Sequence, residues 1–389
     1  MAEATQTKTT IAIDPVTRIE GHLKAEVVVE NGKVVDAKLT GGMYRGFESI
    51  LRGRHPRDAA QIVQRICGVC PTAHATAASI ALEKASGTAV PSNGRATRNL
   101  ILGANYLQSH ILHFYHLAGQ DFIQGPDTAP FMPRYAKPDL RLPPAINAVG
   151  VDQYVEALEV RAVCHEMVAL FGGRMPHVHG ILAGGAAEIP TKEKLVEYAA
   201  RFKKVRKFVE EKYLPVVYLV GSQYKDLGAF GQGYRNALCV GVFPLDDEGK
   251  EFVFKAGAYQ DGKDMPFDVK RVTEDVKFSW FADSTSGKPF TKGENVLEVD
   301  KKGAYSFVKA PLYNGKPMEV GPLARMWVNN KPISSIGQKL FKEYFGLDVK
   351  NFRDMGEDLA FSLLGRHVAR AEESYLMLDV VERFLKEVR

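Results

Sequence analysis

The sequence predicts an α+β fold that is predominantly helical, in which long buried helices surround a core. Three observations lead to this fold class. Several long segments carry apolar residues at helical spacing. Residues 11–50 alternate as strands do, and residues 235–332 break into short strands and turns, which predicts β layers near the start and in the late middle of the chain. The 389 residues are 45% hydrophobic and 25% charged, as in globular proteins, and we expect one large domain over residues 1–389.

The first β layer is predicted by short alternating segments. Residues 11–13 are apolar, and residues 23–29 carry the next apolar run. The dipeptide Asn31-Gly32 then favours a tight hairpin turn into a third strand at residues 33–39.

The helices are predicted from apolar spacing and from their end signals. Residues 71–86 are rich in alanine and stop at Gly87, while Thr191 is placed to cap a helix that runs to about residue 213. Residues 95–119 are apolar around most of the helix circumference, so we expect this helix to be buried. Residues 120–150 are rich in proline and are expected to form an ordered loop. Further helices are expected at 57–66, 151–171, 334–345 and 357–388.

Composition excludes several classes of protein. The net charge of +5 is modest and the basic residues are dispersed, which argues against nucleic-acid binding. Of the four cysteines, Cys164 and Cys239 stand alone, so the chain is not a disulfide scaffold. No apolar run reaches the ~18 residues of a membrane span. The polar first ten residues lack a signal-peptide core. We therefore expect a soluble chain whose export depends on a partner.

The most informative segment is residues 65–74, with the pattern R-x-C-G-x-C-x-x-x-H. Cys67 and Cys70 lie three positions apart and can hold one metal ion between them. Arg65 is a basic neighbour that favours the thiolate form, which is the form that binds metals. Pro71 suits the first position of a helix, which places His74 on the first turn, facing the cysteines. Two thiolates are half of a tetrahedral site.

Two other interpretations of this pair remain open. The cysteines could form a redox dithiol, or they could be small core residues. A thioredoxin-type dithiol follows a strand in a βαβ unit, whereas a predicted helix precedes Cys67. The surrounding Arg65 and His74 therefore favour a metal site, with a zinc-stabilised interaction module as one form of it.

Two acidic residues are candidates for supporting roles. Glu20 lies in residues 14–22, where Asp, Arg, Glu and His cluster between two predicted strands. Near a buried metal it could relay protons, because burial raises the pKa of a carboxyl group; the alternative is a solvated turn with a local Arg–Glu pair. Glu48 is a hard oxygen donor suited to Mg²⁺, or an ordinary acid at the start of a helix.

Two further segments carry candidate residues without a clear chemistry. His110, His113 and His116 share one helix face, which would suit a metal site. The favoured interpretation is that these histidines either pack in the core or support metal ligands without binding the metal, because no carboxylate or thiol shares that face of the helix. Residues 172–180 form a loop flanked by glycines that we expect to be closely packed against another segment.

Taken together, these segments resemble the large, catalytic subunit of nickel–iron hydrogenases of the respiratory, membrane-bound uptake type. The resemblance covers nearly the whole chain. It rests on residues 14–22, 45–48, 65–74, 113–117, 172–177, 318–323 and 364–370. It implies reversible oxidation of H₂ to protons and electrons.

The resemblance also implies a role for each candidate residue. Cys67 would be a terminal thiolate on nickel, and Cys70 would bridge nickel and iron. His74 would donate a hydrogen bond near the bridging sulfur, and Arg65 would lie beside the same thiolates. Glu20 would be the first proton relay, and Glu48 would bind a structural Mg²⁺. The iron would carry cyanide and carbon monoxide.

Partners are implied as well. The chain has too few cysteines to hold iron–sulfur clusters, so an iron–sulfur small subunit would carry them. The family's second motif, D-P-C-x-x-C-x-x-H, is absent, and we expect a separate chain to carry the remaining C-x-x-C nickel ligands. The alternatives are a truncated chain and a degenerate member of the family without nickel. A membrane cytochrome or other electron-transfer subunit would place the complex on the extracytoplasmic, periplasmic face of the membrane. The alternative functions are a non-catalytic or quinone-handling subunit of a respiratory complex and the zinc-stabilised module.

Overall fold

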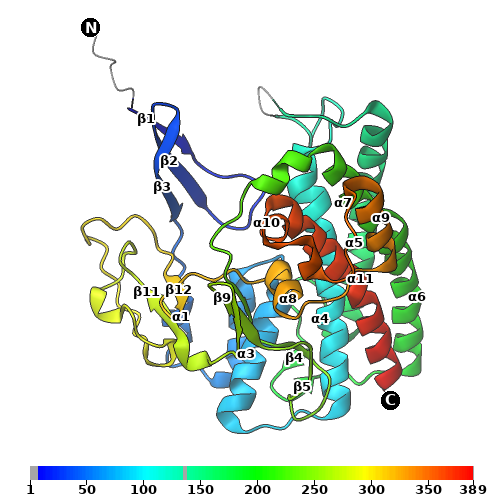
Figure 1. Cartoon of the computed structure of the whole chain (residues 1–389). Helices are drawn as coiled ribbons and strands as arrows, with labels where there is room; N and C mark the ends of the chain where they lie inside the picture. The colour runs from blue at the N-terminus through cyan, green and yellow to red at the C-terminus, as the bar shows by residue number, and fades with distance from the viewer. Residues whose placement is uncertain (1–7, 135–137, 389) are drawn as a thin grey trace. The chain divides into compact units, whose positions relative to one another are not determined.

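The computed structural model describes residues 8–134 and 138–388 (Figure 1). Residues 1–7 of the polar N-terminus discussed above lie outside this part. The chain groups into two compact units, the first formed by Met1–Arg52 with Asp268–Pro317 and the second by Gly53–Phe267 with Met318–Arg389. The long helices all belong to the second unit.

The first unit begins with the predicted three-stranded sheet. Its order is β1-β2-β3, and both pairs of strands are antiparallel. The turn between the last two strands has positive φ at Asn31 (51°) and Gly32 (76°), as a tight hairpin requires. A second pair of strands, β11 and β12, is also antiparallel. The elements of this unit are β1 (Lys8–Ile13), β2 (Leu23–Glu30), β3 (Lys33–Gly41), α1 (Phe47–Leu51), η7 (Val269–Arg271), β11 (Val272–Asp275), η8 (Asp283–Thr285), η9 (Phe290–Lys292) and β12 (Ala310–Tyr313).

The second unit is a bundle of long helices around α4, which is cyan in Figure 1. Both α5 and the red helix α11 pack along α4, and α6 packs on α5. The helical elements are η1 (Pro56–Asp58), α2 (Ala59–Val63), η2 (Gln64–Ile66), α3 (Pro71–Ser86), α4 (Ser92–Leu112), η3 (His113–Ala118), η4 (Gly119–Asp121), α5 (Pro144–Gly172), α6 (Lys192–Phe208), η5 (Val209–Tyr213), α7 (Leu214–Gln223), η6 (Lys225–Ala229), α8 (Pro322–Val328), α9 (Ser335–Phe345), η10 (Phe352–Met355), α10 (Glu357–Ala360) and α11 (Leu363–Glu387).

Short strands complete the second unit, and none has more than four residues. The first two form a hairpin, and β6, β9 and β10 form a small sheet with β9 in its centre. They are β4 (Ile181–Leu182), β5 (Gly185–Ala186), β6 (Ala237–Cys239), β7 (Val242–Pro244), β8 (Phe252–Phe254), β9 (Gly257–Gln260) and β10 (Lys263–Met265). The α+β fold class is confirmed.

Most predicted helices are found, with four kinds of difference. The segment 57–66 is a short α-helix between two 3₁₀ turns, and the segment 357–388 is divided into α10 and α11. The other two differences concern helices that begin with proline and the helix capped by Thr191. Helix α5 starts at Pro144, inside the segment predicted as loop, and α8 lies inside the segment predicted as strands and turns. The helix capped by Thr191 does not stop at about 213, because a π-helical turn, η5, leads directly into α7. Among the described residues, no helix combines the length and apolar character that crossing a membrane requires.

Candidate metal centre

Cys67 and Cys70 lie in the short loop between η2 and α3, and the backbone of this loop folds around one sulfur. Cys67 is 7% exposed. The backbone N–H groups of Val69 and Cys70 both donate to its Sγ, at 3.3 and 3.2 Å. Donors aimed at a sulfur stabilise its thiolate form. The loop therefore directs two backbone donors at the sulfur of Cys67.

Cys70 occupies a position that also favours negative charge. It is the N-cap residue of α3, a helix of 16 residues whose first position is Pro71. The free N–H groups at a helix N-terminus carry partial positive charge. All four cysteines are free thiols, so no disulfide competes for this pair. Two adjacent thiols of this kind fit a soft transition metal.

The glycine-flanked loop of residues 172–180 supports the cysteine loop from one side. Gln64 Nε2 donates to Val178 O at 2.9 Å, just before Cys67. Thr72 Oγ1, just after Cys70, donates to Met175 Sδ at 3.8 Å. Gly180 allows the end of this loop to lie close to the backbone of α5, because a Cβ at position 180 would lie 2.4 Å from Phe171 O. This confirms the prediction of a closely packed loop and shows that its neighbours flank the two thiols.

Arg65 and His74 lie on either side of the thiols in the sequence. Arg65 is exposed, and its Nη1 donates to Gln61 O at 2.6 Å. His74 is half-buried on the first turn of α3, and burial lowers the pKa of its imidazole. A neutral imidazole can donate one hydrogen bond, as the role expected for His74 requires.

The histidine stripe is a set of core residues, as the sequence favoured. His110 Nε2 lies 2.7 Å from Glu373 Oε2, and His116 Nε2 lies 3.2 Å from Tyr154 O. Burial lowers the pKa of His113 to about 3, so this histidine is neutral. The partner carboxylate of His110, Glu373, comes from another helix, α11, which the sequence analysis did not consider. Among the described residues, no three His, Cys, Asp or Glu side chains are grouped so that they could hold a metal ion by themselves.

Glu20 and Glu48 belong to the first unit. Glu20 is exposed, so the desolvation that a relay carboxylate needs is not supplied by the described residues around it. Glu48 lies in the first turn of α1 and lines an open hollow of about 330 Å³. Glu274 and Lys309 line the same hollow, with Lys309 Nζ 3.4 Å from Glu274 Oε2. Both interpretations of Glu48 are compatible with this position.

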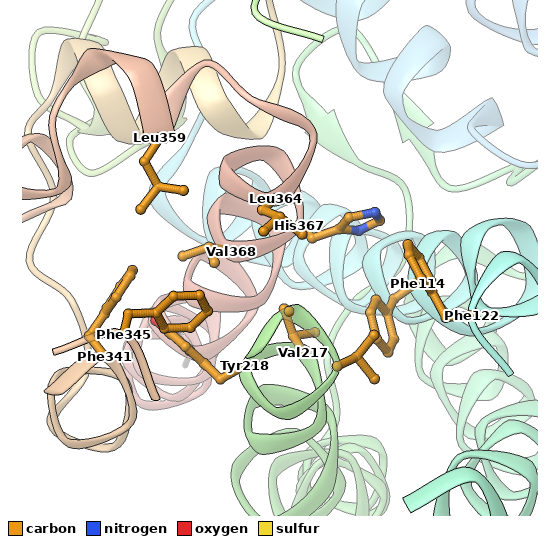
Figure 2. Close-up of a pocket in the computed structure, with 12 residues that line it drawn as sticks. Phe114, Phe122, Val217, Tyr218, Phe341, Phe345, Leu359, Leu364, His367 and Val368 are labelled. Carbon is orange, nitrogen blue, oxygen red and sulfur yellow. The ribbon is translucent and has the colours of Figure 1, made fainter. Parts of the chain in front are cut away.

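A small apolar cavity of about 20 Å³ lies elsewhere in the second unit (Figure 2). Its only ring nitrogens come from His367, whose pKa burial lowers to about 4. Figure 2 shows this ring on the side of the cavity nearest Phe114. The cysteine loop does not line the cavity, which is lined by Phe114, Phe122, Val217, Tyr218, Val220, Gly221, Phe341, Phe345, Leu359, Leu364, His367 and Val368.

One residue that contacts the cysteine loop was missed by the sequence analysis. Gln108, on α4, is fully buried, and its Nε2 donates to Val69 O at 3.2 Å. The sequence contains one indication of this role, a glutamine within a helix that is predicted to be buried, because a buried amide must form hydrogen bonds. Its partner lies 39 positions away, and sequence spacing does not reveal such a contact.

Comparisons with known proteins agree with this site. The family described as nickel-dependent hydrogenase matches residues 45–125 and 120–389, and a HoxL-like family matches residues 10–40. The periplasmic [NiFeSe] hydrogenase large subunit of Desulfomicrobium baculatum is 59% identical over 391 residues, which cover 98% of this chain and 76% of that protein. The hydrogenase-2 large chain of Escherichia coli K12 is 33% identical over 383 residues, covering 82% and 67% of the two chains.

A solved structure extends the comparison to the fold. The Ni-Fe-Se hydrogenase of D. vulgaris Hildenborough in the reduced state matches with a TM-score of 0.96 and 69% identity, over 98% of this chain and 80% of that one. Because the family match extends over most of the sequence and the relatives are this similar, the chain belongs to the nickel-dependent hydrogenases, as a large subunit of these H₂-oxidising enzymes.

Proposed function

We propose that Cys67 and Cys70 bind the nickel–iron centre of this hydrogenase, with Cys67 a terminal ligand of nickel and Cys70 a bridge between nickel and iron. The observation that supports this most is the pair of N–H groups, from Val69 and Cys70, that donate to Cys67 Sγ. Both N–H groups are placed to donate to a sulfur that binds a metal, and thiolates are the ligands that soft metals prefer. The iron is proposed to carry cyanide and carbon monoxide.

The residues around the thiols have distinct tasks in this proposal. When bound, the centre supplies an electron-rich metal with an open position, which polarises H₂. Burial of Cys67 keeps water from its sulfur. His74 holds a proton on its neutral imidazole and donates it in a hydrogen bond toward the Cys70 sulfur. Arg65 contributes positive charge at the surface of the loop.

Substitution of each cysteine tests the ligand assignment. We expect Cys67→Ser and Cys70→Ser to lose most of the nickel in the purified assembly, because a serine hydroxyl is a poor ligand for a soft metal. Cys164→Ala and Cys239→Ala are matched controls at buried thiols outside the loop and should keep it. Elemental analysis measures the outcome. Full nickel in either loop variant, or zinc in place of nickel in the wild type, would contradict the proposal.

Glu20 is proposed to accept the first proton that leaves the centre, on a carboxylate oxygen. We expect Glu20→Gln to suppress steady H₂ turnover while nickel content stays normal, because an amide cannot relay protons. Glu30→Gln, a carboxylate in the same unit that pairs with Lys8, is the control and should keep its activity. Unchanged turnover in Glu20→Gln would remove Glu20 from the path.

Glu48 is proposed to bind Mg²⁺ at the hollow that it lines, because a carboxylate is a hard ligand. Elemental analysis of Glu48→Gln should show less magnesium and unchanged nickel. An unchanged magnesium content would leave Glu48 as an ordinary acid in the first turn of a helix.

We also propose the assembly in which the chain works. An iron–sulfur small subunit receives the electrons. The remaining nickel ligands, of the C-x-x-C type, come from outside the described residues, and the sequence leads us to expect them on a separate chain. The D. baculatum relative is named periplasmic and [NiFeSe], which supports a periplasmic site of action and selenium in the active assembly. Membrane attachment through partners such as a cytochrome is proposed from the resemblance alone. Mass spectrometry of the purified assembly, together with its selenium content, tests these points; an assembly with no iron–sulfur subunit would contradict them.

A further inference from the structure

Gln108 uses both ends of its side-chain amide inside the helix bundle. Its Oε1 accepts from Arg161 Nε at 3.1 Å and from His165 Nε2 at 3.3 Å. Its Nε2 donates to Val69 O at 3.2 Å and to Asn105 Oδ1 at 3.3 Å. The chemistry of the partners fixes the orientation of the amide, because Arg161 can only donate and the Val69 carbonyl can only accept. The amide is saturated, as a fully buried one should be.

The Val69 carbonyl belongs to the same peptide group as the N–H of Cys70. A peptide group is planar, so fixing its oxygen also fixes the direction of its N–H. That N–H donates to Cys67 Sγ at 3.2 Å. A single rigid plane thus joins the amide of Gln108 on α4 to the sulfur of Cys67. Hydrogen bonds in such a series polarise one another, which strengthens the final N–H···S bond.

We propose that Gln108 is a positioning residue of the metal centre, which sets the Val69–Cys70 peptide plane and through it the N–H···S bond to Cys67. This inference deepens the proposed function and rests on Cys67 being a nickel ligand. Gln108 acts through the Val69 carbonyl, which is its contact with the cysteine loop. Arg161 and His165, both on α5, hold the amide in place. The position of the cysteine loop therefore depends on how α4 packs on α5.

A simpler role would be that Gln108 only joins α4 to α5. The two roles use opposite ends of the amide, so they can be separated. Gln108→Glu keeps two oxygens that can accept from Arg161 and His165, but loses the donor to Val69 and to Asn105, which lies on the same helix as Gln108. A carboxylate oxygen would also face the Val69 carbonyl and repel it. This variant therefore keeps the contact between the helices and removes the contact to the loop.

The test compares Gln108→Glu and Gln108→Met with the wild type in the complete assembly. Gln153→Met is the matched control, because it removes one hydrogen bond, from Tyr115, that joins η3 to the same helix α5. Two readouts that do not depend on turnover are used. The first is hydrogen exchange of a peptide that spans residues 64–74. The second is the infrared band of iron-bound carbon monoxide.

We expect exchange at the cysteine loop to become about fivefold to tenfold faster in both Gln108 variants, as loss of one hydrogen bond predicts. The carbon monoxide band should move to lower wavenumber, because a thiolate that accepts fewer hydrogen bonds donates more charge to the metals. Gln153→Met should show neither effect. Unchanged loop exchange and an unchanged band in Gln108→Glu would overturn the proposal, and if Gln108→Met does not fold, Gln108→Glu alone decides.

The failure of this inference can be distinguished from failure of the proposed function. Full nickel retention in Cys67→Ser would remove the ligand assignment. A loss of nickel in Cys67→Ser, together with an unaffected Gln108→Glu, would keep the ligand assignment and reject only the positioning role of Gln108.

Discussion

Two neighbouring residues on α11, Glu372 and Glu373, show how strongly local surroundings decide the state of a buried carboxyl group. Both are almost completely buried. Burial alone would raise the pKa of Glu373, but the charge and hydrogen bonds of Arg325, with a smaller contribution from His110, outweigh burial and hold it at about 2. In the part of the chain that the structure describes, Glu372 has no cation as a partner. Burial raises the pKa of Glu372 to about 7, although hydrogen bonds from Tyr218 and Ser334 act to lower it.

The raised pKa of Glu372 predicts a dependence of stability on pH. Between its ordinary value of 4.5 and about 7, the folded chain keeps a proton on Glu372 that the unfolded chain has lost. The free energy of unfolding should therefore fall as pH rises through this window, by on the order of 3 kcal/mol, and level off above pH 7. Glu372→Gln should remove this part of the slope.

Urea denaturation of both proteins between pH 4.5 and pH 8 measures the difference. Other groups titrate equally in the two proteins, so the difference between their midpoints isolates Glu372. A difference that stays constant over this range would show that the carboxyl group is not protonated in the folded chain.

At the scale of the elements, the structure shows which features local sequence can reveal. Helix α3 was predicted with its bounds, because Pro71 fits its first position and Gly87, with φ 68°, ends it. The beginning of α5 was missed because Pro144 was taken as a sign of loop, although it is a first-turn residue. Helix α7 was missed because the π-helical turn before it shifts the helical register.

The same contrast holds for the site. Cys67 and Cys70 could be found because their chemistry depends on a spacing of three residues. Gln64, Gln108 and the loop around Val178 support them through contacts between distant segments, and only the packing of the elements brings these together. The sequence therefore identified the candidate ligands and a closely packed loop at 172–180, but neither the segment that this loop contacts nor the role of Gln108.

The support from the 172–180 loop predicts the effect of a single methyl group. In Gly180→Ala, the new Cβ would lie 2.4 Å from Phe171 O, so the backbone must move. We expect a loss of about 1–3 kcal/mol in the free energy of unfolding. Nickel content should also fall, because Val178 and Met175 would shift from their contacts with Gln64 and Thr72.

Gly42→Ala is the control, since a Cβ there meets no atom within 4 Å. Denaturant unfolding and elemental analysis of both variants measure the two effects. If Gly180→Ala matches Gly42→Ala in nickel content, the loop does not support the metal centre.

For the whole molecule, the candidate residues are divided between the two compact units. Cys67, Cys70 and His74 belong to the helical unit, whereas Glu20 and Glu48 belong to the unit with the three-stranded sheet. The helical unit also contains the buried ion pair between Arg325 and Glu373. The account of function thus depends first on the helical unit, where both thiols lie.

The central claim is that sulfur atoms of this chain bind nickel, and X-ray absorption at the nickel edge tests it most directly. The account predicts that nickel in the wild-type assembly has thiolate sulfur among its nearest neighbours. It also predicts that any nickel left in Cys67→Ser has one sulfur fewer. Nickel surrounded only by nitrogen and oxygen, or an unchanged number of sulfur neighbours in Cys67→Ser, would contradict it.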